Sequence, residues 1–166
     1  MTAVSPMRAP AHLSTLLPQN TTVYLAQHWP LLRQRRQAFD ENALLVICLC
    51  AEWCAVCRDF KPEYSALAQQ HPKTLFAYID IEDDEALIGA LELDDFPTLV
   101  VFRGDALVHF GIVKAKRSNI VQLLQKLNAS PPQPLSPPPT LQTLCAAVTG
   151  HQIAAPTPDS RTASTR

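Results

Sequence analysis

A run of seven apolar residues, Leu44 to Cys50, ends four residues before Cys54, the first cysteine of a C-x-x-C pair with Cys57. Because polar residues do not alternate within this run, it predicts a central strand with both faces covered by helices. From Cys54 to about residue 70, apolar side chains recur at helical spacing and predict a helix. A buried strand that leads through C-x-x-C directly into a helix constrains the chain to an α/β fold.

The position of the two cysteines indicates their chemistry. Two cysteines separated by two residues can close a small disulfide and open it again. At the start of a helix, the sulfur of Cys54 lies at the positive end of the helix dipole, where a thiolate is stabilised, whereas Cys57 lies one turn further in. The junction of strand, C-x-x-C turn and helix therefore predicts a thiol–disulfide exchange centre.

The residues around the cysteines resemble the active-site motif of the thioredoxin family, over Ala51 to Arg58. Pro62 lies where that family kinks its active-site helix, and Phe96-Pro97-Thr98 is similar to the turn that faces the disulfide in the family. Gly111 resembles a glycine of the family's substrate groove. The likeness covers about residues 22–128 and implies a thioredoxin fold, with a mixed central sheet flanked by helices.

The resemblance also implies the roles of these residues. Cys54 is expected to be the nucleophile and Cys57 the resolving thiol of a protein-disulfide reductase, with a cis peptide bond before Pro97. Its substrates are protein disulfides, its electrons come from an upstream donor similar to thioredoxin reductase, and it needs no cofactor or metal. The resemblance assigns the binding of the substrate to four residues: Trp53, Phe96, Pro97 and Gly111.

Three positions depart from the thioredoxin pattern. Cys48 stands where the family has a buried aspartate that helps proton transfer, and Tyr78 stands in place of a buried lysine. Ala55 and Val56 replace the Gly-Pro pair between the cysteines. These changes predict either a slower proton relay or a relay through water or Glu52, and a weaker reductant than thioredoxin itself.

Other interpretations of the cysteines remain open. Cys48 and Cys50 share one face of the predicted strand, so that with Cys54 and Cys57 they offer four thiolates for a zinc ion. Buried cysteine more often fills a core as a small apolar side chain. An auxiliary redox role for Cys48 and Cys50 is a third interpretation. Cys145 is expected to be a free thiol. The sequence also allows a different function, that of a non-catalytic adaptor or chaperone that binds a partner protein through the groove near Pro97.

Composition limits the partners and the compartment. A net charge of −1 gives no indication of a nucleic-acid or anionic-membrane partner. No apolar stretch reaches the roughly 18 residues of a membrane-spanning helix, and the start of the chain, to Pro30, lacks the layout of a signal peptide. We expect a cytoplasmic monomer, in which five cysteines do not form a structural disulfide framework.

The chain is expected to divide into a flexible segment over residues 1–20, a thioredoxin-like domain over 21–128, and a Pro-rich linker with a disordered tail over 129–166. Within the last part, the apolar patch from Leu141 to Val148 is expected to form one or two helical turns.

Within the domain, Pro30 is expected in the first turn of a helix, Gly104 in a tight hairpin and Ser118 as the cap of the last helix. The further elements expected are an edge strand at 23–25, a helix at 31–39, a strand at 75–81, a short helix at 84–91, and a hairpin of 99–102 with 106–108.

Overall fold

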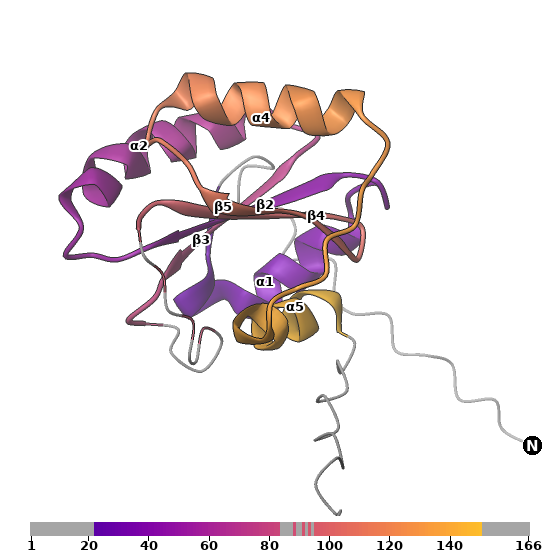
Figure 1. Cartoon of the computed structure of the whole chain (residues 1–166), viewed down its shortest axis with the longest axis horizontal. Coiled ribbons are helices and arrows are strands. Elements are labelled where there is room, and N and C mark those ends of the chain that lie inside the picture. Colours follow the sequence, from indigo (N-terminus) through magenta and orange to yellow (C-terminus); the bar gives the residue numbers. More distant parts are fainter. Residues whose placement is uncertain (1–21, 84–87, 89–90, 92, 94, 151–166) are drawn as a thin grey trace, which may run out of the picture.

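The computed structural model describes residues 22–83, 88, 91, 93 and 95–150. Their centre is a five-stranded mixed sheet with the strand order β1-β3-β2-β4-β5 (Figure 1). β2 lies in the middle, parallel to β3 and antiparallel to β4. The strands are β1 (Val23–Tyr24), β2 (Leu44–Cys50), β3 (Leu75–Asp80), β4 (Thr98–Arg103) and β5 (Ala106–Ile112).

Helices cover both faces of the sheet. α2 and α4 lie on one face, and α1 and α5 lie on the other (Figure 1). The helices are α1 (Leu25–Gln37), α2 (Ala55–Gln70), α4 (Arg117–Ala129), the short 3-10 helix η1 (Pro139–Leu141) and α5 (Gln142–Thr149). This arrangement confirms the predicted α/β class and thioredoxin fold.

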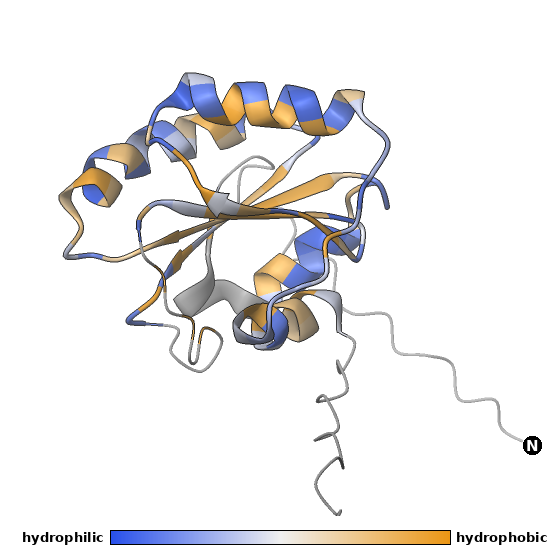
Figure 2. Ribbon diagram, viewed as in Figure 1, coloured by the Kyte–Doolittle hydropathy of each residue, from blue (hydrophilic) through white to orange (hydrophobic). Residues whose placement is uncertain are grey.

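The central strand divides its side chains between two apolar cores. All seven residues of β2 are buried, and successive side chains point to opposite faces. Ile47 and Leu49 belong to the core beside α1 and α5, whereas Cys48 and Cys50 belong to the core beneath α2 and α4. Figure 2 shows the strands as largely apolar and the helices as apolar on one side only. Both cysteines of β2 therefore face the helix that carries Cys57.

α2 is held to the sheet by Tyr64, whose side chain is fully buried. Its hydroxyl lies 3.0 Å from the carbonyl oxygens of both Val46 and Ala77, and so bridges β2 and β3. Pro62 lies inside the same helix, as expected. The buried tyrosine fixes the helix that begins at the C-x-x-C turn relative to the strand that leads into it.

The hairpin between β4 and β5 turns at Gly104, which has a φ of +54°. A Cβ there would lie 2.9 Å from the backbone oxygen of Glu41, so glycine is required by both backbone angle and space. The predicted hairpin is confirmed. The predicted edge strand is also present as β1, paired with β3.

Two predicted helix starts are wrong. α1 begins at Leu25, directly after β1, so Pro30 lies inside the helix rather than in its first turn. α4 begins at Arg117 with Lys116 at the N-cap position, and no side chain caps it, so Ser118 is already within the helix. In both cases tertiary packing sets the boundary rather than the local capping signal.

The prediction of a linker and disordered tail from residue 129 onward is wrong for residues 139–149. η1 and α5 pack on the sheet, because an apolar patch there is large enough to be buried. The prediction of one or two helical turns for the patch from Leu141 to Val148 is confirmed by α5, whose eight residues make about two turns. Its buried residues are Leu141, Leu144, Cys145 and Val148.

Residues 131–138, the Pro-rich stretch between α4 and η1, form no helix or strand. This stretch crosses from α4 to the opposite face of the sheet (Figure 1), and on the way the Leu135 N–H donates to the Leu107 carbonyl oxygen at 2.7 Å. The predicted segment 1–20 and the last part of the predicted tail, residues 151–166, lie outside the described residues. So does most of the predicted helix at 84–91, of which Ile88 is described and buried.

Candidate active site

Cys54 is the N-cap residue of α2, at the point where the chain leaves β2. Its backbone is extended, with φ of −80° and ψ of 110°, and its side chain is half-buried. The Cys57 N–H donates to the Cys54 sulfur at 3.4 Å, and the Arg58 N–H donates to the Cys54 carbonyl oxygen at 3.1 Å. An N-cap sulfur accepts one of the helix N–H groups that have no partner within the helix. The sequence therefore places an accessible sulfur on a helix N-terminus.

Cys57 lies one turn further along α2 and is fully buried. Burial, and next the side chain of Cys50, raise the pKa of Cys57 well above that of an ordinary thiol, although a backbone hydrogen bond at Ala51 acts in the opposite direction. The two cysteines of the C-x-x-C pair are thus unequal: one sulfur reaches the surface, and the other stays a neutral thiol inside. Both are free thiols in this structure.

The loop before β4 carries Phe96 and Pro97, and the peptide bond between them is cis, as predicted. Pro97 is buried, and its carbonyl oxygen accepts the Val113 N–H at 3.1 Å. Phe96 packs against the core that contains Cys57, where Cys54 also packs. The loop is tied to the C-x-x-C turn by a ring contact: Trp53 meets Phe96 edge-on, with centroids 5.5 Å apart.

Gly111 lies on β5, paired with Leu99 of β4. A Cβ at this position would lie 3.8 Å from the His109 ring, an ordinary van der Waals contact. The contacts of this glycine therefore leave room for a side chain, and its part in a substrate groove stays a prediction that rests on the family resemblance.

Large apolar side chains are exposed around the C-x-x-C turn. Trp53 is 62% exposed and Val56 is 51% exposed. Ile112, 56% exposed, pairs with Thr98, which directly follows Pro97. Exposed apolar groups next to a reactive group are typical of a protein-binding surface. Val56 and Ile112 were not predicted as surface residues, although Val56 lies between the two cysteines and Ile112 follows Gly111.

A second pair of thiols lies beneath this surface. The sulfurs of Cys48 and Cys50 are 3.7 Å apart, and both side chains are fully buried. The side chain of Cys48, followed by burial, raises the pKa of Cys50 far above its ordinary value. Burial, followed by the side chain of Cys50, also raises the pKa of Tyr78. Lys61 brings a positive charge to the outer side of this cluster, with its Nζ 5.1 Å from the centroid of the Tyr78 ring.

The arrangement of the four cysteines bears on the alternative of a zinc site. In the part of the chain that the structure describes, no three histidine, cysteine, aspartate or glutamate side chains are grouped so that they could hold a metal ion. The four cysteines around the C-x-x-C turn are thus arranged as two pairs rather than as a metal-binding cluster: Cys54, which is half-buried, with the buried Cys57, and Cys48 with Cys50, both buried. Across residues 22–83, 88, 91, 93 and 95–150, no helix has the length and apolar character needed to cross a bilayer.

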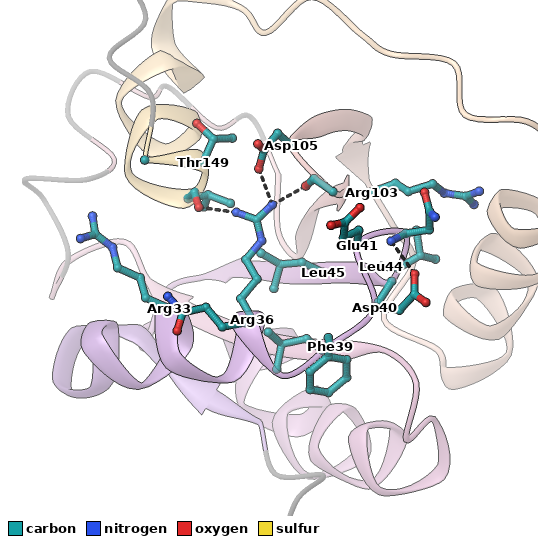
Figure 3. A pocket seen from close by; sticks show the side chains of 17 residues that line it. Arg33, Arg36, Phe39, Asp40, Glu41, Leu44, Leu45, Arg103, Asp105 and Thr149 are labelled. Carbon is teal, nitrogen blue, oxygen red and sulfur yellow. Dashed lines mark hydrogen bonds and ion pairs between the residues drawn. The ribbon is translucent and has the colours of Figure 1, made fainter. Parts of the chain in front are cut away.

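A cavity of about 800 Å³ lies at the start of β2, whereas the C-x-x-C turn follows its end. Figure 3 shows Arg36 at its centre, between α1, the β4–β5 hairpin and α5. Arg36 donates to the carbonyl oxygens of Val148 and Gly104 and pairs with Asp105 at 2.9 Å. These contacts give Arg36 a structural role, since they attach the C-terminal helix to the domain.

Comparison with known proteins agrees with this geometry. The family model described as Thioredoxin matches residues 34–126. A thioredoxin of Mycoplasma pneumoniae is 27% identical over 95 residues, which are 57% of this chain and 93% of the relative. A putative thioredoxin 2 of Streptomyces coelicolor is 33% identical over 67 residues, covering 40% of this chain and 50% of the relative.

Solved structures show the same fold. A poplar thioredoxin h matches with a TM-score of 0.56 and 18% identity, over 67% of this chain and 99% of that chain. Thioredoxin from Fasciola hepatica matches with a TM-score of 0.53 and 23% identity, over 63% of this chain and 98% of that chain. At these identities the solved structures support the fold alone. The relationship to thioredoxins rests on the match to the family model and on the relatives found by sequence.

Proposed function

This chain belongs to the thioredoxin family of thiol–disulfide oxidoreductases, and we propose that it reduces disulfides in target proteins with Cys54 as nucleophile and Cys57 as resolving thiol. The observation that carries the proposal is the inequality of the two sulfurs, one half-exposed on a helix N-terminus and the other fully buried one turn away. A nucleophile must reach its target, and a resolving thiol must be shielded from competing attack.

The proposed reaction has two exchange steps. The Cys54 thiolate attacks one sulfur of the target disulfide, and a mixed disulfide forms as the other target sulfur leaves as a thiolate. Cys57 then attacks Cys54, which closes the Cys54–Cys57 disulfide and releases the second target sulfur. Because the pKa of Cys57 is raised, its proton must be removed during this step, and Cys48 stands in place of the acid that serves this purpose in the family. We therefore expect resolution to be slower than in thioredoxin itself.

The proposed substrate surface is formed by Trp53, Phe96, Pro97 and Gly111, extended by Val56 and Ile112. An extended target segment would pair its backbone with the residues around Phe96 in the manner of an added strand. The exposed apolar side chains would contact the target on either side of its disulfide. This surface favours unfolded or extended protein substrates over small disulfides.

The oxidised protein needs an electron donor. One matched structure, at 17% identity and a TM-score of 0.53, is a thioredoxin f2 in complex with ferredoxin:thioredoxin reductase. By analogy we propose that a reductase similar to thioredoxin reductase returns electrons to Cys54 and Cys57. We place the protein in the cytoplasm as a monomer, with a role in cell redox homeostasis and without a nucleic-acid or membrane partner.

An insulin-reduction assay with dithiothreitol as electron source tests the proposal. The wild-type protein should accelerate insulin precipitation, and Cys54→Ser should abolish the acceleration. Cys145→Ser is the matched control, because Cys145 is a buried thiol in the core on the other face of the sheet. Equal activity of wild type and Cys54→Ser, or none in either, would instead favour the adaptor function that uses the groove without its cysteines.

A further inference from the structure

A surface segment of the domain takes no part in the proposed reaction. It is the Pro-rich stretch, residues 131–138, between α4 and η1. Its first six residues are exposed and its last two are half-buried. Five of its eight residues are proline, and because proline has no backbone N–H, most of this backbone cannot join a helix or a sheet.

The backbone of this stretch is extended in the manner of polyproline II. Proline restricts its own φ to about −65° and moves the residue before it out of the helical region. At one end Ser130 has φ of −103° and ψ of 148°, and at the other Pro138 has φ of −60° and ψ of 153°. The angles of Pro138 are close to those of polyproline II, a left-handed helix with three residues per turn.

The prolines recur with the period of that helix. Pro131, Pro134 and Pro137 are three residues apart, and each is preceded by serine or glutamine. Three x-Pro dipeptides therefore repeat about every 9 Å along one edge of a polyproline II segment. A segment that only connected α4 to α5 would need the length of this stretch, but not its repeat.

The stretch is fixed to the domain at three points. The Ser130 N–H donates to the Lys126 carbonyl oxygen at 3.3 Å, and η1, beyond the other end, is anchored by the fully buried Leu141. Between them, the Leu135 N–H donates to Leu107 of β5, while the Leu135 side chain stays 45% exposed. Because folding already orders this segment, a partner that binds it loses less conformational entropy than on binding a free linker.

No charged side chain belongs to the stretch or to its neighbours in the sequence. Residues 127–150 contain no aspartate, glutamate, lysine, arginine or histidine. Recognition must therefore depend on apolar contact with the proline rings and on hydrogen bonds to the exposed backbone carbonyl oxygens. Aromatic side chains provide both, because tyrosine and tryptophan combine a large apolar ring with a hydrogen-bond donor.

We propose that the Pro-rich stretch is a docking segment for a partner protein with an uncharged groove lined by aromatic side chains, which accepts two of the x-Pro dipeptides. The stretch meets β5 at Leu107, whereas Ile112 of the proposed substrate surface lies about 17 Å further along the same strand. A docked partner leaves Cys54 open to its targets and determines where in the cell the protein acts. The proposal does not depend on the proposed function.

Calorimetric titration of the reduced full chain with a WW, an SH3 and an EVH1 domain tests the proposal, since all three bind polyproline II segments in aromatic grooves. At least one domain should bind with one site per chain. The double substitution of Pro134→Ala and Pro137→Ala should weaken its binding by about tenfold or more, because it truncates the central contacts. Binding should be equal at low and high salt, since the segment carries no charge.

Pro72→Ala is the matched control, because Pro72 is also exposed but lies in the turn after α2, and this variant should bind like the wild type. The double variant should reduce insulin at the wild-type rate. Excess poly-L-proline should displace the wild-type chain from the domain, a measurement that needs no variant. Absence of binding by all three domains, equal affinity of wild type and double variant, or failure of poly-L-proline to compete would each overturn the docking segment and leave the proposed function untouched.

Discussion

The Trp53 ring meets the Phe96 ring edge-on, with centroids 5.5 Å apart and 86° between the planes. Trp53 belongs to the C-x-x-C turn, and Phe96 precedes the cis-proline. The contact therefore connects the two segments that form the proposed substrate surface. In the sequence, the segment with Trp53 precedes β3 and the segment with Phe96 follows it. Trp53 also remains largely exposed, so the same ring fixes the Phe96 loop and presents a surface to a partner.

The Trp53→Ala variant should lower kcat/KM for insulin reduction, mostly through a higher KM. An aromatic pair contributes about 0.5–1.5 kcal/mol beyond its buried area, which corresponds to an effect of about two- to thirteenfold. A double-mutant cycle with Phe96→Ala measures the coupling directly, and the two losses should be less than additive. Independent losses would show that the ring contact does not organise the surface. Alkylation of Cys54 at an unchanged rate serves as the control.

The C-terminal helix should contribute to the stability of the domain. Leu144 is 1% exposed in the core beside α1, so Leu144→Ala is expected to lower the free energy of unfolding by about 2–5 kcal/mol. Leu135→Ala is the matched control, because Leu135 is 45% exposed and a surface truncation costs about 0.5 kcal/mol or less. Urea denaturation measures the free energy of unfolding of both variants. Equal effects would mean that α5 does not belong to the folded domain.

The sequence predicts the centre of the molecule well because the signals there are local. The apolar run of β2 and the helical spacing after Cys54 lie next to one another in the chain, and the two-residue period of a strand already places Cys48 and Cys50 on one face. The cis bond before Pro97 is confirmed, although composition and spacing give no indication of it and the prediction came from the family resemblance.

Features that depend on tertiary packing were harder to predict. α5 is a short helix after a run of prolines, and helices of this length are stable only when they bury a face. The interaction of Cys57 with Cys50 depends on how α2 packs on β2, which the spacing of the cysteines does not determine. The start of α1 before Pro30 follows from the chain turning directly out of β1, and no capping residue indicates it.

The native reduced protein should have one fast thiol. Cys54 is half-buried, and the four other cysteines are buried. Burial raises the pKa of Cys145 to about 11, which further lowers its thiolate population. Iodoacetamide treatment in native buffer should therefore add one group rapidly, and Cys54→Ser should remove this fast phase. A fast phase of two or more groups would show that the buried thiols open readily to solvent.

Stability should fall as the pH decreases because of His109 on β5. The Nε2 atom of this ring is buried without a hydrogen-bond partner among the described residues, and burial, then Lys126, lowers the pKa of His109. The unfolded chain, with a histidine pKa of about 6.5, binds more protons below that pH, so the free energy of unfolding decreases by up to about 1.4 kcal/mol per pH unit until the lower pKa of the folded state is reached. In the His109→Gln variant, this decrease in the free energy of unfolding with falling pH should disappear. Urea denaturation of both proteins from neutral to mildly acidic pH measures the difference. Parallel stability curves would show that His109 titrates alike in the folded and unfolded states.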